Sequence, residues 1–363
     1  MVGKRPFIHI LLILLALFMC RMGEVQAQGM WQTTDVNGVE YVKLSDVWRF
    51  YNFQPRKGRS GCVSYGAANR VVSVRASRQD FYVNNYRYVL SYPVIDRHGQ
   101  LMISSTDMKK LVDPVLRPQY SANAGVLRTV VIDAGHGGHD AGAVSPYARE
   151  KDCNLAVAKK LRARLQRLGY RVVMTREGDY FLTLQQRVQI ANRVPDSIFV
   201  SIHHNSGRSA ATGIETFTLA PHGTTSPFAR SRRTEDLAGN NQDSENIALA
   251  TAVHSHAIRS TRAEDRGIQR ARFSVLCTIR RPAILFEGGF VSNPAEGRLI
   301  STSKYQDKLA ESICKGIVAY NNTVCRRAKP ANKLRKKGYV RTSIPGSSIG
   351  TVGGLRKKGR QSK

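Results

Sequence analysis

The 363-residue sequence has few cysteines, few acidic residues and only one long apolar run. Its six cysteines are widely spaced and include no Cys-x-x-Cys pair, which excludes a zinc–thiolate cluster and a disulfide-framework fold. Asp and Glu number 26 against 56 Lys and Arg, so the net charge is +30. The one long apolar run covers residues 7–20, and no other stretch is long enough to cross a membrane.

The N terminus has the pattern of a secretory signal peptide. Lys4 and Arg5 precede the apolar run, and residues 25–27 offer a small-x-small cleavage site, so we expect a signal peptide over residues 1–27. A membrane anchor is the alternative, although the run is short for one, and a lipoprotein site at Cys20 is disfavoured because Met19 precedes it. The mature protein is therefore predicted to be exported, either to the periplasm or to the cell wall. Five cysteines remain after cleavage, and their pairing stays open.

The mature chain divides into four parts by composition. We predict a small α+β accessory domain over 28–118, a linker over 119–126, a catalytic domain over 127–323 and a basic tail over 324–363. Residues 326–363 contain 13 Lys or Arg and no Asp or Glu, so the tail should be disordered. It is either a solvated tail without a partner or a segment that binds anionic envelope polymers or the membrane surface. Export makes nucleic acid an unsuitable physiological partner, and nothing indicates the oligomeric state.

The first domain contains a weak internal repeat. Residues 41–47 and 102–108 both predict a short strand, a Ser/Thr cap and a helix start. Between them, 71–75 alternates as a strand, 81–88 predicts a hairpin, and 97–100 predicts a turn. This order resembles the small domain called copper-amine-oxidase N-terminal-like, which often accompanies cell-wall enzymes. No clustered His or Cys supports copper here, and we favour a spacer or stalk over a ligand-binding role.

The second domain alternates strand and helix patterns. Strands are predicted over 128–133, 171–174, 197–203, 213–219 and 283–286, and helices over 152–168, 184–193, 244–260 and 304–320. Gly169 is expected to end the first helix, and Ser244 to cap the third. The βαβ rhythm predicts an α/β fold with a mainly parallel twisted sheet flanked by helices.

Three side chains with metal or acid–base chemistry, His136, His203 and Glu287, lie at or just beyond predicted strand ends. A fourth, Glu150, follows seven residues after the first of these segments (130–143), where a helix is expected to begin. The carboxyl ends of parallel strands meet at one edge of a sheet, where ligands bind. Two His and one Glu can hold zinc and leave its fourth position open, as catalytic sites require. A second Glu could then act as general base.

Two neighbouring histidines are rivals as ligands. His139 follows His136 by three residues, and His204 follows His203 directly. Alternation along the strand places His203 on the face opposite Ile202, with His204 pointing away from it. Glu150 has a plainer alternative explanation, because carboxylates are favoured at helix starts.

Six segments carry a specific resemblance to a known family. DAGHGGHDAGA, REKDCNLAVAKKL, MTREGD, LQQRVQIANR, FVSIHHNS and ILFEGGFVSNP resemble, in order and spacing, the zinc-dependent N-acetylmuramoyl-L-alanine amidases of type 3. The resemblance covers residues 127–323 and implies a phosphorylase/hydrolase-like fold. It also implies one Zn²⁺ held by His136, Glu150 and His203, with Glu287 as the catalytic carboxylate. His204 departs from the pattern, since the family commonly has a small residue there.

The implied activity is hydrolysis of the amide between N-acetylmuramic acid and L-alanine in peptidoglycan. One alternative is a zinc carboxypeptidase or aminopeptidase, which would need a basic residue for a terminal carboxylate or a second set of metal ligands. The other is a non-catalytic envelope-binding protein, which the four intact site positions disfavour. In related amidases an inserted segment can carry a Glu that blocks the metal, and Glu235 within 221–243 is the candidate here.

Overall fold

The computed structural model describes residues 31–121, 125–226 and 234–324. The predicted signal peptide, Cys20, Cys325 and nearly all of the basic tail lie outside these ranges. Within the described ranges, no helix is both long and apolar enough for a membrane crossing. The predicted domain boundaries stay predictions.

The N-terminal part confirms the predicted strand–helix repeat. Strand β2 (Val39–Lys43) leads into helix α2 (Leu44–Phe50), and β9 (Gln100–Ser104) leads into α3 (Ser105–Asp107). The two strands pair antiparallel in a sheet of order β1-β2-β9-β8, completed by β1 (Thr33–Val36) and β8 (Ile95–Arg97). The cap forms at the second copy, where the Ser104 side chain accepts the N–H of Asp107.

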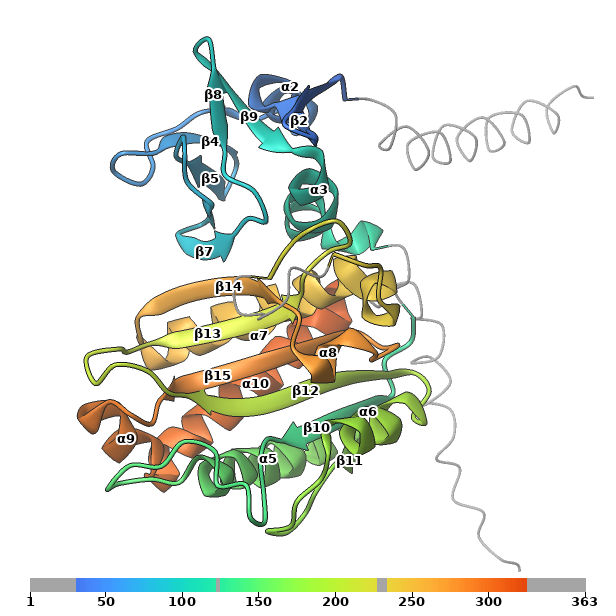
Figure 1. Cartoon of the computed structure of the whole chain (residues 1–363), viewed down its shortest axis with the longest axis vertical. Coiled ribbons are helices and arrows are strands. Elements are labelled where there is room, and N and C mark those ends of the chain that lie inside the picture. Colours follow the sequence, from blue (N-terminus) through green and yellow to red (C-terminus); the bar gives the residue numbers. More distant parts are fainter. Residues whose placement is uncertain (1–30, 122–124, 227–233, 325–363) are drawn as a thin grey trace, which may run out of the picture. The chain divides into compact units, whose positions relative to one another are not determined.

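An antiparallel meander accounts for the rest of this part (Figure 1). Its strands are β3 (Gln54–Pro55), β4 (Val63–Ala67), β5 (Arg70–Val74), β6 (Asp80–Val83) and β7 (Tyr86–Val89). The predicted hairpin joins β6 to β7 through Asn84 and Asn85, whose φ angles are 49° and 69°. Positive φ at both turn residues suits the twist of a two-residue hairpin. The chain then continues through three short helical segments: η2 (Met108–Val112), α4 (Asp113–Leu116) and η3 (Pro118–Tyr120).

The second part is built on a mainly parallel sheet, as predicted. Its strands run β11-β10-β12-β15-β13-β14, and β14 continues the sheet by pairing with β7. Among the described strands of this part, only β13 and β15 pair antiparallel. The bounds are β10 (Thr129–Ala134), β11 (Arg171–Met174), β12 (Ser197–Asn205), β13 (Ile214–Leu219), β14 (Asp265–Ala271) and β15 (Ala283–Phe290).

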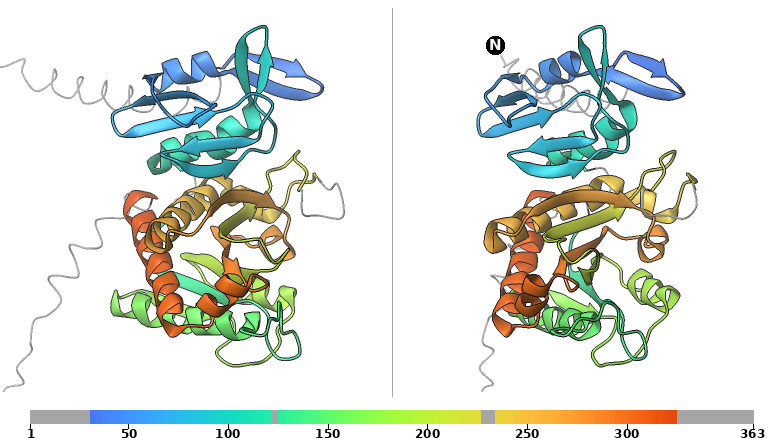
Figure 2. Two further views of the ribbon diagram at one scale, coloured as in Figure 1. Left: turned by 90° about the vertical axis from the view of Figure 1, so that its left-hand side faces the viewer. Right: turned by 60° about the vertical axis from the view of Figure 1, so that its left-hand side comes forward.

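Helices cover both faces of this sheet, as Figures 1 and 2 show. Helices α5 (Glu150–Arg167), α7 (Asp243–Thr261) and α10 (Ser303–Val324) lie on one face, and α6 (Leu184–Asn192) and α8 (Ser274–Cys277) lie on the other. Strand β10 is buried from both sides: Val130 and Ile132 pack into the first core, and Val131 packs into the second. Two shorter helices complete the fold, η4 (Ala238–Gln242) and α9 (Pro294–Ile300).

The predicted helix ends are partly confirmed. Gly169 follows α5 with φ 85°, the left-handed conformation that glycine adopts without strain. The predicted Ser244 cap is wrong: α7 begins at Asp243, and its N-cap residue Gln242 makes no side-chain cap bond. The reason is that η4 runs directly into α7, so the chain is already helical before Ser244.

Candidate metal centre

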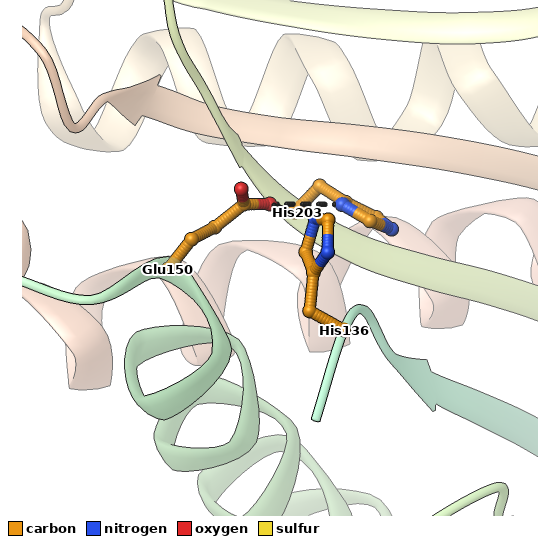
Figure 3. Close-up of side chains that lie close together, drawn as sticks. All are labelled: His136, Glu150 and His203. Carbon is orange, nitrogen blue, oxygen red and sulfur yellow. Dashed lines mark hydrogen bonds and ion pairs between the residues drawn. The ribbon is translucent and has the colours of Figure 1, made fainter. Parts of the chain in front are cut away.

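Three of the four predicted site residues form one compact cluster (Figure 3). His136 follows β10, Glu150 is the first residue of α5, and His203 lies on β12. One ligand atom from each lies within 4.8 Å of the other two. Glu150 Oε1 is 3.1 Å from His136 Nε2 and 2.9 Å from His203 Nδ1. The arrangement is therefore a possible site for a metal ion.

Glycines provide the turn and the space that this cluster needs. His136 itself has φ 61°, and Gly137 and Gly138 continue the turn with φ 132° and 60°. A β-carbon at Gly135 would collide with the His203 ring, and one at Gly142 would collide with the Glu150 carboxylate. Gly137 and Gly138 thus continue the turn at His136, and Gly135 makes room for the ring of His203.

Charge within the cluster favours an ionised Glu150. Burial alone would raise the pKa of Glu150, but hydrogen bonds from His136 and His203 lower it below its usual value. The pKa of His136 is raised, because Glu150 and Asp140 outweigh the effect of burial. An ionised carboxylate is the form in which Glu150 could bind a cation.

Asp140 orients the His136 ring, a role that was not predicted from the sequence. Its Oδ2 lies 2.8 Å from His136 Nδ1, which leaves Nε2 directed towards Glu150. Carboxylates that hold the second nitrogen of a metal-binding histidine commonly fix its orientation. The available signal was the spacing His136-x-x-x-Asp140 within the glycine-rich segment.

Asp140→Ala is expected to weaken metal binding by roughly 10–100-fold, the usual effect of removing such a partner. The ring would keep its nitrogen donor but lose the group that aims it. Titration against a calibrated chelator measures the change, with Asp46→Ala, on α2, as the control. An unchanged affinity would leave Asp140 only as the acceptor of the Gly142 N–H.

Glu287 reaches the same edge of the sheet through its place on β15. It stands in register with His203 on β12 and with Glu215 on β13. Its Oε2 is buried and has no hydrogen-bond partner in the described part of the chain. Burial, followed by the charges of Glu150 and Glu215, raises the pKa of Glu287 well above its usual value. The two site carboxylates therefore have opposite pKa shifts.

The rival histidines have other surroundings. His139 is exposed, and its ring lies 4.2 Å from that of Phe181. His204 is buried with Nδ1 2.7 Å from Asn154 Oδ1, and burial lowers its pKa to about 4. Asn154 also donates a hydrogen bond to Glu150 Oε1 at 3.2 Å, so Asn154 connects the His204 ring to the Glu150 carboxylate of the cluster. Neither histidine belongs to the three-residue group found among the described residues.

Glu235 does not join the cluster either. It is exposed, and its backbone carbonyl accepts a hydrogen bond from Arg272. The three-residue group found in the described ranges does not include it. The hypothesis of a blocking glutamate therefore gains no support here.

The donor set fits a zinc ion. Two imidazole nitrogens and one carboxylate oxygen are typical of catalytic zinc sites. The Oε2 atom of Glu287, which has no hydrogen-bond partner among the described residues, is also consistent with a metal site. A buried carboxylate oxygen without a partner is destabilising, so its presence is better explained by a role in catalysis. An α/β sheet with a possible metal-ion site at its strand ends is the arrangement expected of a metal-dependent hydrolase.

Comparison with known proteins gives the family. The family model described as N-acetylmuramoyl-L-alanine amidase matches residues 130–319, more than half of the chain. The chain belongs to this family of cell-wall hydrolases. The family, the α/β fold class and the enzyme class predicted from the six segments are confirmed. The match begins after the N-terminal part, whose copper-amine-oxidase-like resemblance stays a prediction.

Three proteins illustrate what the chain is similar to. The uncharacterized protein YqiI of Bacillus subtilis is 36% identical over 193 residues, which cover 53% of this chain and 84% of that protein. N-acetylmuramoyl-L-alanine amidase AmiA of Escherichia coli is 30% identical over 244 residues, covering 60% and 84%. The solved catalytic domain of CwlV, an amidase from Bacillus (Paenibacillus) polymyxa, is 35% identical with a TM-score of 0.46, covering 54% of this chain and 99% of that one.

Proposed function

We propose that this protein is a zinc-dependent amidase that cuts the bond between N-acetylmuramic acid and L-alanine in peptidoglycan. His136, Glu150 and His203 would hold one Zn²⁺, and Glu287 would be the catalytic carboxylate. One observation carries the proposal: in a chain of the amidase family, three ligand atoms within 4.8 Å of one another lie beside a strand that brings Glu287 into register with His203.

When bound, zinc would polarise the amide carbonyl and make a water molecule more acidic. The proton transfers would belong to Glu287, whose unpartnered Oε2 can take a proton from the attacking water and pass it to the departing amine. Its raised pKa makes it a stronger base than an exposed carboxylate. Glu150, with a lowered pKa, would keep its charge and its role as a ligand. Such opposite shifts in paired carboxylates are typical of a division of roles.

Digestion of purified peptidoglycan tests this function. Mass analysis of the released fragments should find stem peptides with a free L-alanine amino terminus, and chelation should stop their release until zinc is restored. Shortened stem peptides would instead indicate a peptidase. Binding to peptidoglycan without any cleavage would indicate the non-catalytic alternative.

The proposal includes export, because peptidoglycan lies outside the cytoplasmic membrane. The predicted signal peptide supports it, as does the basic tail, whose charge suits anionic envelope polymers or a membrane surface. For the accessory domain we keep the role of a spacer or stalk. Both terminal segments lie outside the described residues.

Truncation after Val324, the last residue of α10, is expected to weaken binding to cell-wall sacculi at low salt while leaving hydrolysis of a small soluble muropeptide near its full rate. Thirteen basic residues without acidic partners give an attraction that salt screens strongly. Pull-down at several salt concentrations measures the first effect, and turnover of the muropeptide measures the second. Equal loss of both would show that the tail belongs to the catalytic fold.

A further inference from the structure

Two buried arginines lie beneath the loop that carries His136. The side chains of Arg176 and Arg187 are 0% and 3% exposed, although each carries a full charge. Arg176 lies two residues beyond the end of β11, and Arg187 lies on α6. Both direct their guanidinium groups at backbone carbonyls of the site rather than at solvent.

Arg176 joins three separate segments of the chain. Its Nε donates to Ala134 O at 2.8 Å, and its Nη2 donates to Gly135 O at 2.9 Å and to Lys151 O at 2.7 Å. Its Nη1 donates to Gly178 O at 3.0 Å. Gly135 precedes His136, and Lys151 follows Glu150. One side chain therefore fixes the backbone next to two of the three proposed ligands.

Arg187 holds the same loop from the other face of the sheet. Its Nη2 donates to the carbonyl of His136 at 2.8 Å, and its Nη1 donates to Ala134 O at 2.8 Å. Nη1 also pairs with Asp133 Oδ1 at 2.7 Å. Asp133 is itself held by hydroxyl groups of Thr175 and Ser201. Together the two arginines bind three successive carbonyls, those of residues 134, 135 and 136.

The chemistry of Arg176 argues for a specific role. A buried charge is costly unless it is paired, and no ion pair of Arg176 occurs within the described ranges. Its hydrogen bonds to four carbonyls compensate for lost water only because those carbonyls converge on it. A lysine could not reach four acceptors from one nitrogen, since the planar guanidinium spreads its donors in a fixed fork.

The three proposed ligands differ in how their backbone is held. His203 lies on β12, which pairs with β10 on one side and with β15 on the other. His136 lies in a turn with φ 61°, and Glu150 begins a helix. These two are the ligands whose backbone the sheet does not fix, and they are the ones beside the carbonyls that the arginines hold.

We infer that Arg176 and Arg187 are positioning residues that keep His136 and Glu150 in ligand geometry before a cation arrives. Binding of the ion then does not have to order the loop, and its affinity is higher for that reason. The inference rests on the metal site proposed above. It adds that the two arginines keep that site rigid.

Zinc affinity of the purified full chain, measured by competition with a chelator, tests the inference. Arg176→Lys and Arg187→Lys should each weaken zinc binding by roughly 10–100-fold, the range found when the groups supporting a metal ligand are removed. The zinc concentration for half-maximal turnover should rise by the same factor. Arg270→Lys is the matched control, because Arg270 is also buried but donates to the carbonyl of Lys110. Its zinc affinity should change less than about twofold.

A lower melting temperature with unchanged zinc affinity would overturn the inference, because the arginines would then serve only folding. Failure of the wild-type protein to bind zinc would instead reject the metal site itself.

Hydrogen exchange of the wild-type protein provides a second test, which does not depend on whether the variants fold. The amides of Gly135, Gly137 and Glu150 all donate to backbone carbonyls and should be protected equally with and without zinc. Fast exchange that only zinc suppresses would also overturn the inference.

Discussion

Glu287→Gln is expected to bind zinc near one equivalent while its turnover falls by at least ~10²–10⁴-fold, the usual contribution of a positioned acid–base group. Glutamine keeps the shape of the side chain but cannot carry the proton from water to the departing amine. The loss could exceed this range, because the same Oε2 would serve both transfers. Elemental analysis gives the zinc content, and release of stem peptides gives the turnover.

The control for this variant is Glu311→Gln, which removes a carboxylate from the surface of α10. It should retain both zinc and activity. Zinc loss in Glu287→Gln would make Glu287 a ligand rather than the base. Full activity with normal zinc would move the proton transfer to another group.

Alanine at each proposed ligand should remove the metal together with the activity. His136→Ala, Glu150→Ala and His203→Ala each take one of three protein donors from the ion, so we expect zinc far below one equivalent and turnover near background. Glu150→Ala should have the largest effect on the site's shape, since Glu150 Oε1 lies within 3.1 Å of both ring nitrogens. The same two measurements apply to all three variants.

His256→Ala controls for the loss of a partly buried histidine outside the cluster, on α7. It should bind zinc like the wild type. Normal zinc in His203→Ala would shift the ligand to His204. That outcome would also require Asn154 to release the His204 ring that it now contacts.

Local patterns were sufficient to predict the elements that carry the site. Strands β10, β12 and β15 each contain a mainly apolar run, and His136, His203 or Glu287 lies at or just after the end of that run, so burial and the break both appear in the sequence. Strand β14 was missed, because Asp265–Ala271 has few apolar residues and forms by backbone pairing with β13. No periodicity indicates such a strand.

The supporting residues could not be predicted because their roles depend on distant backbone atoms. Arg176 and Arg187 lie more than 40 positions from the carbonyl of Ala134 that both contact. Both lie in segments that carry the family resemblance, but the sequence does not indicate which backbone carbonyls they contact. Asn154 is similar: its contact with His204 spans 50 positions.

For protein engineering, the facing carboxylates of Glu215 and Glu287 are a weak point of the fold. Two carboxylates directly opposite each other on paired strands oppose folding, and although Arg266 pairs with Glu215, Glu287 Oε2 has no partner within the described ranges. A screen that rewards heat resistance alone would therefore favour a neutral residue at position 287. Such a variant would be more stable but would lack the catalytic base, so its stability would rise while its activity fell. Heat-resistant forms of this enzyme should be sought away from β13 and β15.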